Sequence, residues 1–178
     1  HGVDLGPLQP ILMQRICTPN RRIQLAPELI LADLDRVRQT WLDESANGQT
    51  LVLIGRRQLR SNNSWMHNSP RLVRGKDRCT LLMHPDDAQA HNLTDGALVK
   101  VCSRTGEIHL PLAVTNDIMP GVVSITHGWG HDREGVMLET AVKHPGASIN
   151  DLTDDQQIDQ LTGNAAFCGV SVRVEPVV

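Results

Sequence analysis

Aromatic residues are scarce in this chain of 178 residues, which has no Tyr, one Phe and three Trp. The core must therefore be built from Val, Ile, Leu, Ala and Met, and an aliphatic, β-branched core is compatible with a small β-barrel. A chain of this length can bury such a core without disulfides or metals, and it suits one domain with a short extension.

Paired cysteines, long apolar runs and a leader peptide are lacking as well. The four cysteines, Cys17, Cys79, Cys102 and Cys168, form no CxxC pair, so the spacing favours buried thiols over a zinc site. No apolar run approaches the roughly 18 residues of a membrane span, and no signal peptide is visible. We expect a cytoplasmic protein without membrane contact. The chain starts at His1 without Met, as a processed product or a piece of a larger protein would.

Net charge is small, at −3, and gives no case for nucleic-acid binding. The charge is nevertheless unevenly spread. The segment 56–78 holds Arg56, Arg57, Arg60, Arg71, Arg74, Lys76 and Arg78 against Asp77 alone, whereas 151–159 is acidic. The positive end lies in and just beyond the loop "GRRQLRSNNSWMHN", residues 55–68, which is either a solvated turn or a site for an anion.

Hydrophobic spacing predicts mainly β structure after residue 49. We expect strands at 50–55, 78–84, 97–103, 107–115, 121–126 and 168–176, with one helix starting at Pro85 and Asn92 at its C-terminal cap. Before them, prolines predict an irregular segment over residues 1–30, and apolar spacing predicts a helix over about 28–43. Short strands at this spacing are typical of a barrel or sandwich.

Four motifs in one order carry a family resemblance. They are "LVLIGRRQLRSNNSWMHN", "HPDDAQAHNLTDGALVKVCSRTGEIHLPLAVTNDIMPGVVSITHGWGH", "GASINDLT" and "LTGNAAFCGVSVRVEP". Together they resemble the C-terminal domain of the molybdopterin oxidoreductases, the dimethyl sulfoxide reductase superfamily, which includes formate dehydrogenases and nitrate reductases. The resemblance covers about residues 50–176. It implies a six-stranded double-psi β-barrel over 49–178, preceded by a linker and helix over 1–48 that end the preceding domain.

The resemblance also implies a cofactor, bis(molybdopterin guanine dinucleotide) with molybdenum or tungsten, and a set of contacts to it. Arginine suits the pyrophosphate because its planar fork binds two oxygens at once, and hydroxyl and amide groups suit the edges of the heterocycles. The expected contacts are Arg56, Arg57, Arg60, Ser61, Asn62, Asn63, His127, Gly128, Trp129, Asn150, Phe167 and Cys168.

Several of these residues have a second interpretation. Trp129 suits a core anchor as well as a cofactor wall, Asn150 suits a turn or cap, and Phe167 suits packing. Trp65 and Met66 are expected to pack the loop back onto the barrel. The spacing of His127, His131 and Glu134 only loosely resembles a metal site, and His84, Asp86 and Asp87 favour a helix start over a catalytic group.

The resemblance places the residue that binds the metal upstream of this chain, so no catalytic residue is expected here. We expect the C-terminal part of an oxidoreductase, which forms one wall of the cofactor site beside the preceding domains. Alone it should be inactive and cofactor-free. The alternative is a double-psi barrel that binds an acidic partner through the arginine loop. A self-cleaving pyruvoyl enzyme is disfavoured because no convincing cleavage site is present.

Overall fold

The computed structural model describes residues 2–46 and 50–177. The chain divides into two compact units, His1–Ala46 and Asn47–Val178. The second unit contains every residue for which a cofactor contact is expected, and its strands are the frame that positions them.

The first unit contains three helices and no buried side chain among those described. Its helices are α1 (Leu12–Arg15), α2 (Glu28–Ala32) and α3 (Leu34–Ala46). The single helix predicted over 28–43 is wrong in one respect, since it is interrupted at Asp33. There the backbone N–H bonds to the carbonyl of Ile30 in a tighter turn, and the carboxylate accepts from Arg36 at 2.6 and 2.7 Å. No helix among the described residues could span a membrane.

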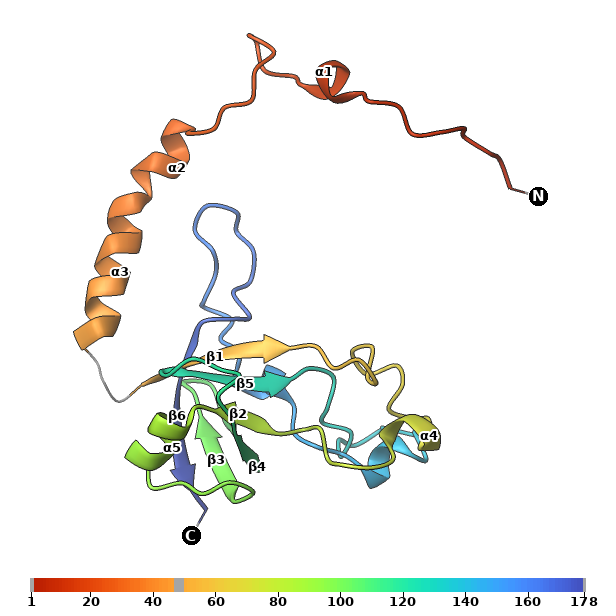
Figure 1. The fold of residues 1–178 in the computed structure, drawn as a ribbon, viewed down its shortest axis with the longest axis vertical. Helices are drawn as coiled ribbons and strands as arrows, with labels where there is room; N and C mark the ends of the chain where they lie inside the picture. The colour runs from red at the N-terminus through yellow and green to blue at the C-terminus, as the bar shows by residue number, and fades with distance from the viewer. Residues whose placement is uncertain (1, 47–49, 178) are drawn as a thin grey trace. The chain divides into compact units, whose positions relative to one another are not determined.

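Six strands of the second unit close into a barrel (Figure 1). They are β1 (Leu51–Arg56), β2 (Leu81–Met83), β3 (Leu98–Cys102), β4 (Glu107–Val114), β5 (Val122–Thr126) and β6 (Val170–Pro176). Their order around the barrel is β1-β5-β2-β4-β3-β6. The pairs β1–β5 and β2–β4 are parallel and the other four are antiparallel. The expectation of a mainly β, six-stranded barrel is confirmed.

Alternation of side chains explains why these segments close around one core. Successive residues of a strand point to opposite faces, and the inward set is aliphatic throughout. The fully buried members are Leu53, Leu81, Met83, Val99, Val101, Leu112, Val123, Ile125 and Val172. An aliphatic core without aromatic rings thus suffices to fill a barrel of six strands. The strand expected at 78–84 is shorter than predicted, since its regular pairing covers only Leu81–Met83.

The longest helix in the described part of the barrel unit is α5 (Pro85–Ala90), and it has the caps that the sequence predicts. The Nδ1 atom of His84 accepts the N–H of Asp86 at 3.2 Å, which confirms the helix start. Asn92 has a φ of 56°, and the following N–H of Leu93 bonds to the carbonyl of Ala88 at 2.8 Å. This is a Schellman-type end. Three one-turn elements were not predicted: α4 (Pro70–Val73), η1 (Ala141–Lys143) and η2 (Ile149–Leu152).

Candidate functional site

A hollow of about 420 Å³ gathers residues from four separate segments of the barrel unit. The segments are the loop after β1, the turn after β5, η2 and the loop before β6. The lining residues are Arg57, Asn63, Ser64, His127, Gly128, Trp129, His131, Asn150 and Phe167. Seven of these nine belong to the contacts expected from the sequence. Sequence positions up to 110 residues apart therefore meet at one place, as a common ligand would require.

The loop after β1 is a chain of tight turns. Asn62 and Asn63 have φ angles of 41° and 64°, in the left-handed region that Asn tolerates better than other residues with a side chain. The N–H of Met66 bonds to the carbonyl of Ser61 at 3.1 Å, and the N–H of His67 bonds to that of Ser64 at the same distance. The Ser-Asn-Asn-Ser run thus shapes the loop and also places Asn63 and Ser64 in the wall of the hollow.

The turn after β5 lies directly against that loop because its glycines have no β-carbon. A β-carbon on Gly128, whose φ is 90°, would lie 2.2 Å from the carbonyl oxygen of Asn63. On Gly130 it would lie 2.7 Å from the β-carbon of Ser148. The N–H groups of Gly130 and His131 both bond to the carbonyl of Pro145. The turn is therefore held between two other segments, and its backbone forms part of the hollow.

The charge of the hollow favours an anion. Arg57 is exposed and makes no hydrogen bond or ion pair with any described residue, while none of the described lining residues is acidic. Burial, and then the neighbouring charge of Arg57, lower the pKa of His127, which favours its neutral form. Amide, hydroxyl and backbone groups supply neutral donors and acceptors around the single cation. Such a set suits a phosphoryl group joined to a polar heterocycle.

Two aromatic side chains line the hollow in different ways. Trp129 is 8% exposed and Phe167 is 58% exposed. Trp129 is thus both a buried anchor and part of the wall, which joins the two interpretations that the sequence left open. Phe167 does not pack into the core of the described residues. Its exposed ring is free to stack on a heterocycle.

Five of the expected contacts lie outside the lining of the hollow. They are Arg56, Arg60, Ser61, Asn62 and Cys168. Arg56 turns into the barrel wall, where its guanidinium donates to the carbonyl of Ser124 and, at 2.8 Å, to that of Thr80. Ser61 is 1% exposed, so its side chain supports the loop from within. Arg60, Asn62 and Cys168 are exposed, and their contact with a cofactor stays a prediction.

The expected contacts left out two residues that line the hollow, and the expectation for Trp65 is wrong. Ser64 and His131 line the hollow, and the repeated His and Gly of "THGWGH" were the signal that could have included His131. Trp65, expected to pack the loop onto the barrel, is 83% exposed. That expectation is wrong because the turn that follows Asn63 points the side chain of residue 65 away from the described residues. No group of three metal-ligating side chains occurs among the residues that the structure describes.

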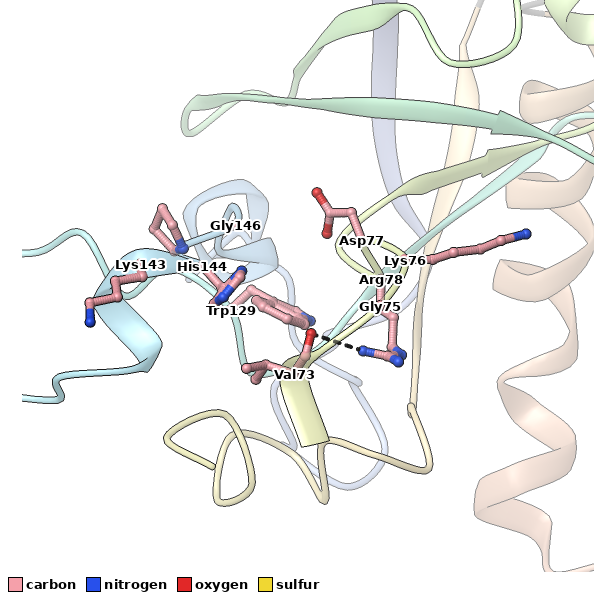
Figure 2. A pocket seen from close by; sticks show the side chains of 10 residues that line it. Val73, Gly75, Lys76, Asp77, Arg78, Trp129, Lys143, His144 and Gly146 are labelled. Atoms are coloured by element: carbon pink, nitrogen blue, oxygen red, sulfur yellow. Dashed lines mark hydrogen bonds between the residues drawn. The ribbon is translucent and has the colours of Figure 1, made fainter. Parts of the chain in front are cut away.

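Trp129 also lines a second hollow, of about 330 Å³, with Lys76, Arg78, Lys143 and His144 (Figure 2). Its basic residues do not converge. Figure 2 shows the ammonium ends of Lys76 and Lys143 turned away from the indole. The guanidinium of Arg78 donates instead to the carbonyls of Leu72, Val73 and Arg74, at the end of α4. The hollow beside Arg57 is therefore the better candidate for an anionic ligand.

Comparison with protein families agrees with the site. Residues 51–171 match the family described as "Molydopterin dinucleotide binding domain". The chain belongs to this family. The match extends from β1 to the start of β6 and includes all four segments that form the hollow, and it confirms the resemblance on which the expected contacts rest.

The curated relatives are much longer enzymes. The chain is 36% identical over 104 residues to dimethyl sulfoxide/trimethylamine N-oxide reductase of Rhodobacter capsulatus, a match that covers 58% of this chain and 12% of that protein. It is 30% identical over 100 residues to dimethyl sulfoxide reductase DmsA of Escherichia coli, covering 56% and 12%. The chain thus spans about an eighth of the length of these relatives.

A solved structure supports the architecture. The barrel resembles part of acetylene hydratase from Pelobacter acetylenicus with a TM-score of 0.59 and 22% identity, covering 76% of this chain and 19% of that one. At this level of identity the likeness shows the fold alone. Together with the strand order, it confirms the double-psi β-barrel expected from the sequence.

Proposed function

We propose that the barrel unit binds a molybdopterin guanine dinucleotide in the hollow beside Arg57 and forms one wall of a bis(molybdopterin guanine dinucleotide) site. On this proposal the chain is the C-terminal part of a molybdenum or tungsten oxidoreductase. The observation that carries it is the meeting of Arg57, Asn63, His127, Asn150 and Phe167 at one hollow, in a domain of the molybdopterin dinucleotide binding family.

The residues present fit such a ligand. Arg57 carries the only formal charge among the described lining residues and has a free guanidinium for phosphoryl oxygens. Asn63, Ser64 and Asn150 would pair with polar edges of guanine or pterin, because amides and hydroxyls can both donate and accept. Gly128 exposes backbone to the hollow, which allows a ligand to approach closely. The bound metal and its dithiolenes would supply the redox chemistry, and this chain's residues would bind and orient the cofactor.

The first unit carries large apolar side chains that its own described residues do not cover. None of the described side chains between residues 2 and 46 is buried. Large apolar residues such as Leu29, Ile30, Leu31 and Val37 are between 47% and 71% exposed. Folded proteins seldom leave so many large apolar side chains of one short segment in water. We assign residues 1–48 as the end of a preceding domain of the same enzyme and expect that domain to cover this surface.

The experiment that tests the proposal is a cofactor analysis of the longer polypeptide that contains this chain. The purified protein is heated in acid, and the extract is assayed for oxidised pterin by fluorescence, for guanine nucleotide by chromatography, and for molybdenum and tungsten by mass spectrometry. We expect two guanine nucleotides and two pterins for each metal atom. A protein that carries metal and pterin but no guanine nucleotide would contradict the dinucleotide assignment, and a protein without pterin would contradict the proposal as a whole.

A further inference from the structure

Two buried histidines belong to the wall of the hollow, since His131 is part of its lining and His67 contacts both His131 and Trp129. His67, in the loop after β1, is 1% exposed, and His131, in the turn after β5, is 8% exposed. The Nδ1 atom of His67 and the Nε2 atom of His131 are 2.7 Å apart, which is a hydrogen bond between side chains 64 positions apart in the sequence. The Nε2 atom of His67 has no hydrogen-bond partner of ordinary geometry among the described residues, although the backbone of Gly128 lies near enough to the ring to raise its pKa slightly. A buried polar atom without a partner lowers stability, so its presence needs an explanation in the structure or the function around it.

The pair supports the turn that lines the hollow. The ring of His67 stacks on the indole of Trp129, with centroids 3.9 Å apart and planes 30° apart. It meets the ring of His131 edge-on, with centroids 5.0 Å apart and planes at 85°. One imidazole thus contacts both ends of the segment Trp129–His131. Since Gly128 already lies against Asn63, the loop holds the turn at three points.

The hydrogen bond between His67 and His131 can form only in some protonation states of the two rings. A hydrogen bond between two ring nitrogens uses one N–H and one lone pair, so at least one of the two facing nitrogens must be unprotonated. When both rings are cations, the two facing nitrogens both carry protons and the bond is lost. Burial, then the neighbouring His131, lowers the pKa of His67 to about 4, against a smaller opposite effect of the Gly128 carbonyl. Burial also lowers the pKa of His131, against Asp132.

We propose that His67 is a positioning residue of the cofactor hollow, which holds the turn 127–131 through its hydrogen bond to His131 and its stacking on Trp129, and which releases that turn when both imidazoles are protonated. The inference rests on the proposed function, because it concerns the same site. The titratable groups around the pair belong to three segments: Arg57 in the loop after β1, His127 and Asp132 in the turn after β5, and Lys143 and His144 beside Trp129. The effect of His67 on the hollow passes through its contacts with Trp129 and His131.

Two substitutions separate the stacking from the hydrogen bond. His67→Phe keeps a flat ring against Trp129 and removes the bond to His131. His67→Asn keeps a donor near the position of Nδ1 and removes the ring. Each variant is made in the longer polypeptide, and retained guanine nucleotide is measured after gel filtration between pH 7.5 and pH 4. In parallel, ¹⁵N spectra of the histidine rings in this chain report which nitrogens carry protons at each pH.

The wild-type protein should retain nucleotide at pH 7.5 and release it over the pH range in which the spectra show the second imidazole becoming charged. His67→Phe should release nucleotide about tenfold faster at pH 7.5, and His67→Asn should remain within about threefold of wild type there but lose the coupling between release and ring protonation. Equal retention by wild type and His67→Phe at every pH would overturn the inference alone. If neither variant folds, retention of nucleotide by wild type with both rings charged overturns it. Absence of nucleotide from wild type at pH 7.5 would overturn the proposed function, and this inference with it.

Discussion

The imidazole of His127 lies against the α-carbon of Gly55, so closely that a β-carbon at position 55 would fall 2.1 Å from Nε2. Gly55 is in β1 and His127 follows β5, the strand that pairs with β1 in parallel. The φ of Gly55 lies outside the left-handed region, so space alone requires glycine here. The absence of one methyl group in the barrel wall thus allows His127 to reach the hollow.

Gly55→Ala should therefore displace the ring of His127 without unfolding the barrel. The imidazole turns toward water, and its pKa, which burial and the charge of Arg57 lower, should rise toward the ordinary value. Nuclear magnetic resonance titration of the histidine rings measures this change. Gly2→Ala is the control, because nothing lies within 4 Å of a β-carbon there. An unchanged pKa of His127 in Gly55→Ala would contradict the contact.

Gly128→Ala should cost more, because it combines a strained backbone with a collision. Gly128 has a φ of 90°, and the new methyl group would lie 2.2 Å from the backbone oxygen of Asn63. We expect a loss of about 3 kcal/mol in the free energy of unfolding. Gly121→Ala is a matched control with a φ of 79° and nothing within 4 Å, and it should cost about 1 kcal/mol for backbone strain alone. Equal losses in urea denaturation would show that the two segments do not touch.

Arg56→Ala should weaken the barrel itself. The guanidinium joins β5 to the residue before β2, since it bonds to the carbonyl of Ser124 and to both oxygens of Thr80. Without it, partly buried carbonyls lose a charged donor, which costs about 2 kcal/mol. The neighbouring exposed Arg57→Ala should change the free energy of unfolding by less than about 0.5 kcal/mol. Denaturant unfolding measures the loss in both variants. A larger loss in Arg57→Ala than in Arg56→Ala would refute the assignment of Arg56 to the barrel.

Stability should fall as acid is added below neutral pH because of His67. Its pKa is about 4 in the folded chain and near the ordinary 6.5 in the unfolded chain. As the pH falls, the unfolded state therefore binds a proton before the folded state does. The contribution of His67 to the free energy of unfolding is complete above about pH 6.5 and is lost as the pH falls toward 4. The full effect is on the order of 3 kcal/mol. Unfolding curves at pH 7, 5.5 and 4 for wild type and His67→Phe measure it, and parallel losses in the two proteins would rule out this source.

The strands were predictable because each needs only its own alternation of apolar residues. The aliphatic runs of β1, β3 and β6 are plain in the sequence, and Asn92 at the end of α5 follows from local chemistry. The break at Asp33 and the exposure of Trp65 were missed for a different reason. The break at Asp33 depends on which local hydrogen bonds the chain forms, and the exposure of Trp65 depends on whether its side chain finds a partner elsewhere. Periodicity carries no information about either.

The candidate site was predictable in its members and not in its geometry. The resemblance named Arg57, Asn63, His127, Asn150 and Phe167, which the barrel then brings to one hollow. It could not tell Arg57 from Arg56, whose adjacent side chains point to opposite faces of the chain at the end of β1. It also missed the pair formed by His67 and His131, because a contact over 64 positions is made by the closed barrel rather than by any local pattern.

The most direct test of the central claim compares two arginines of the same loop. Arg57 lines the hollow, whereas Arg60, which is also exposed, does not. Each is replaced by Ala in the longer polypeptide, and the guanine nucleotide retained per protein is measured after identical purification. Loss of a charge-assisted bond to phosphate should lower retention about tenfold or more in Arg57→Ala, and the loss should be clearly smaller in Arg60→Ala, whose side chain lies outside the hollow. Equal nucleotide content in Arg57→Ala and wild type would contradict the assignment of the hollow as the cofactor site.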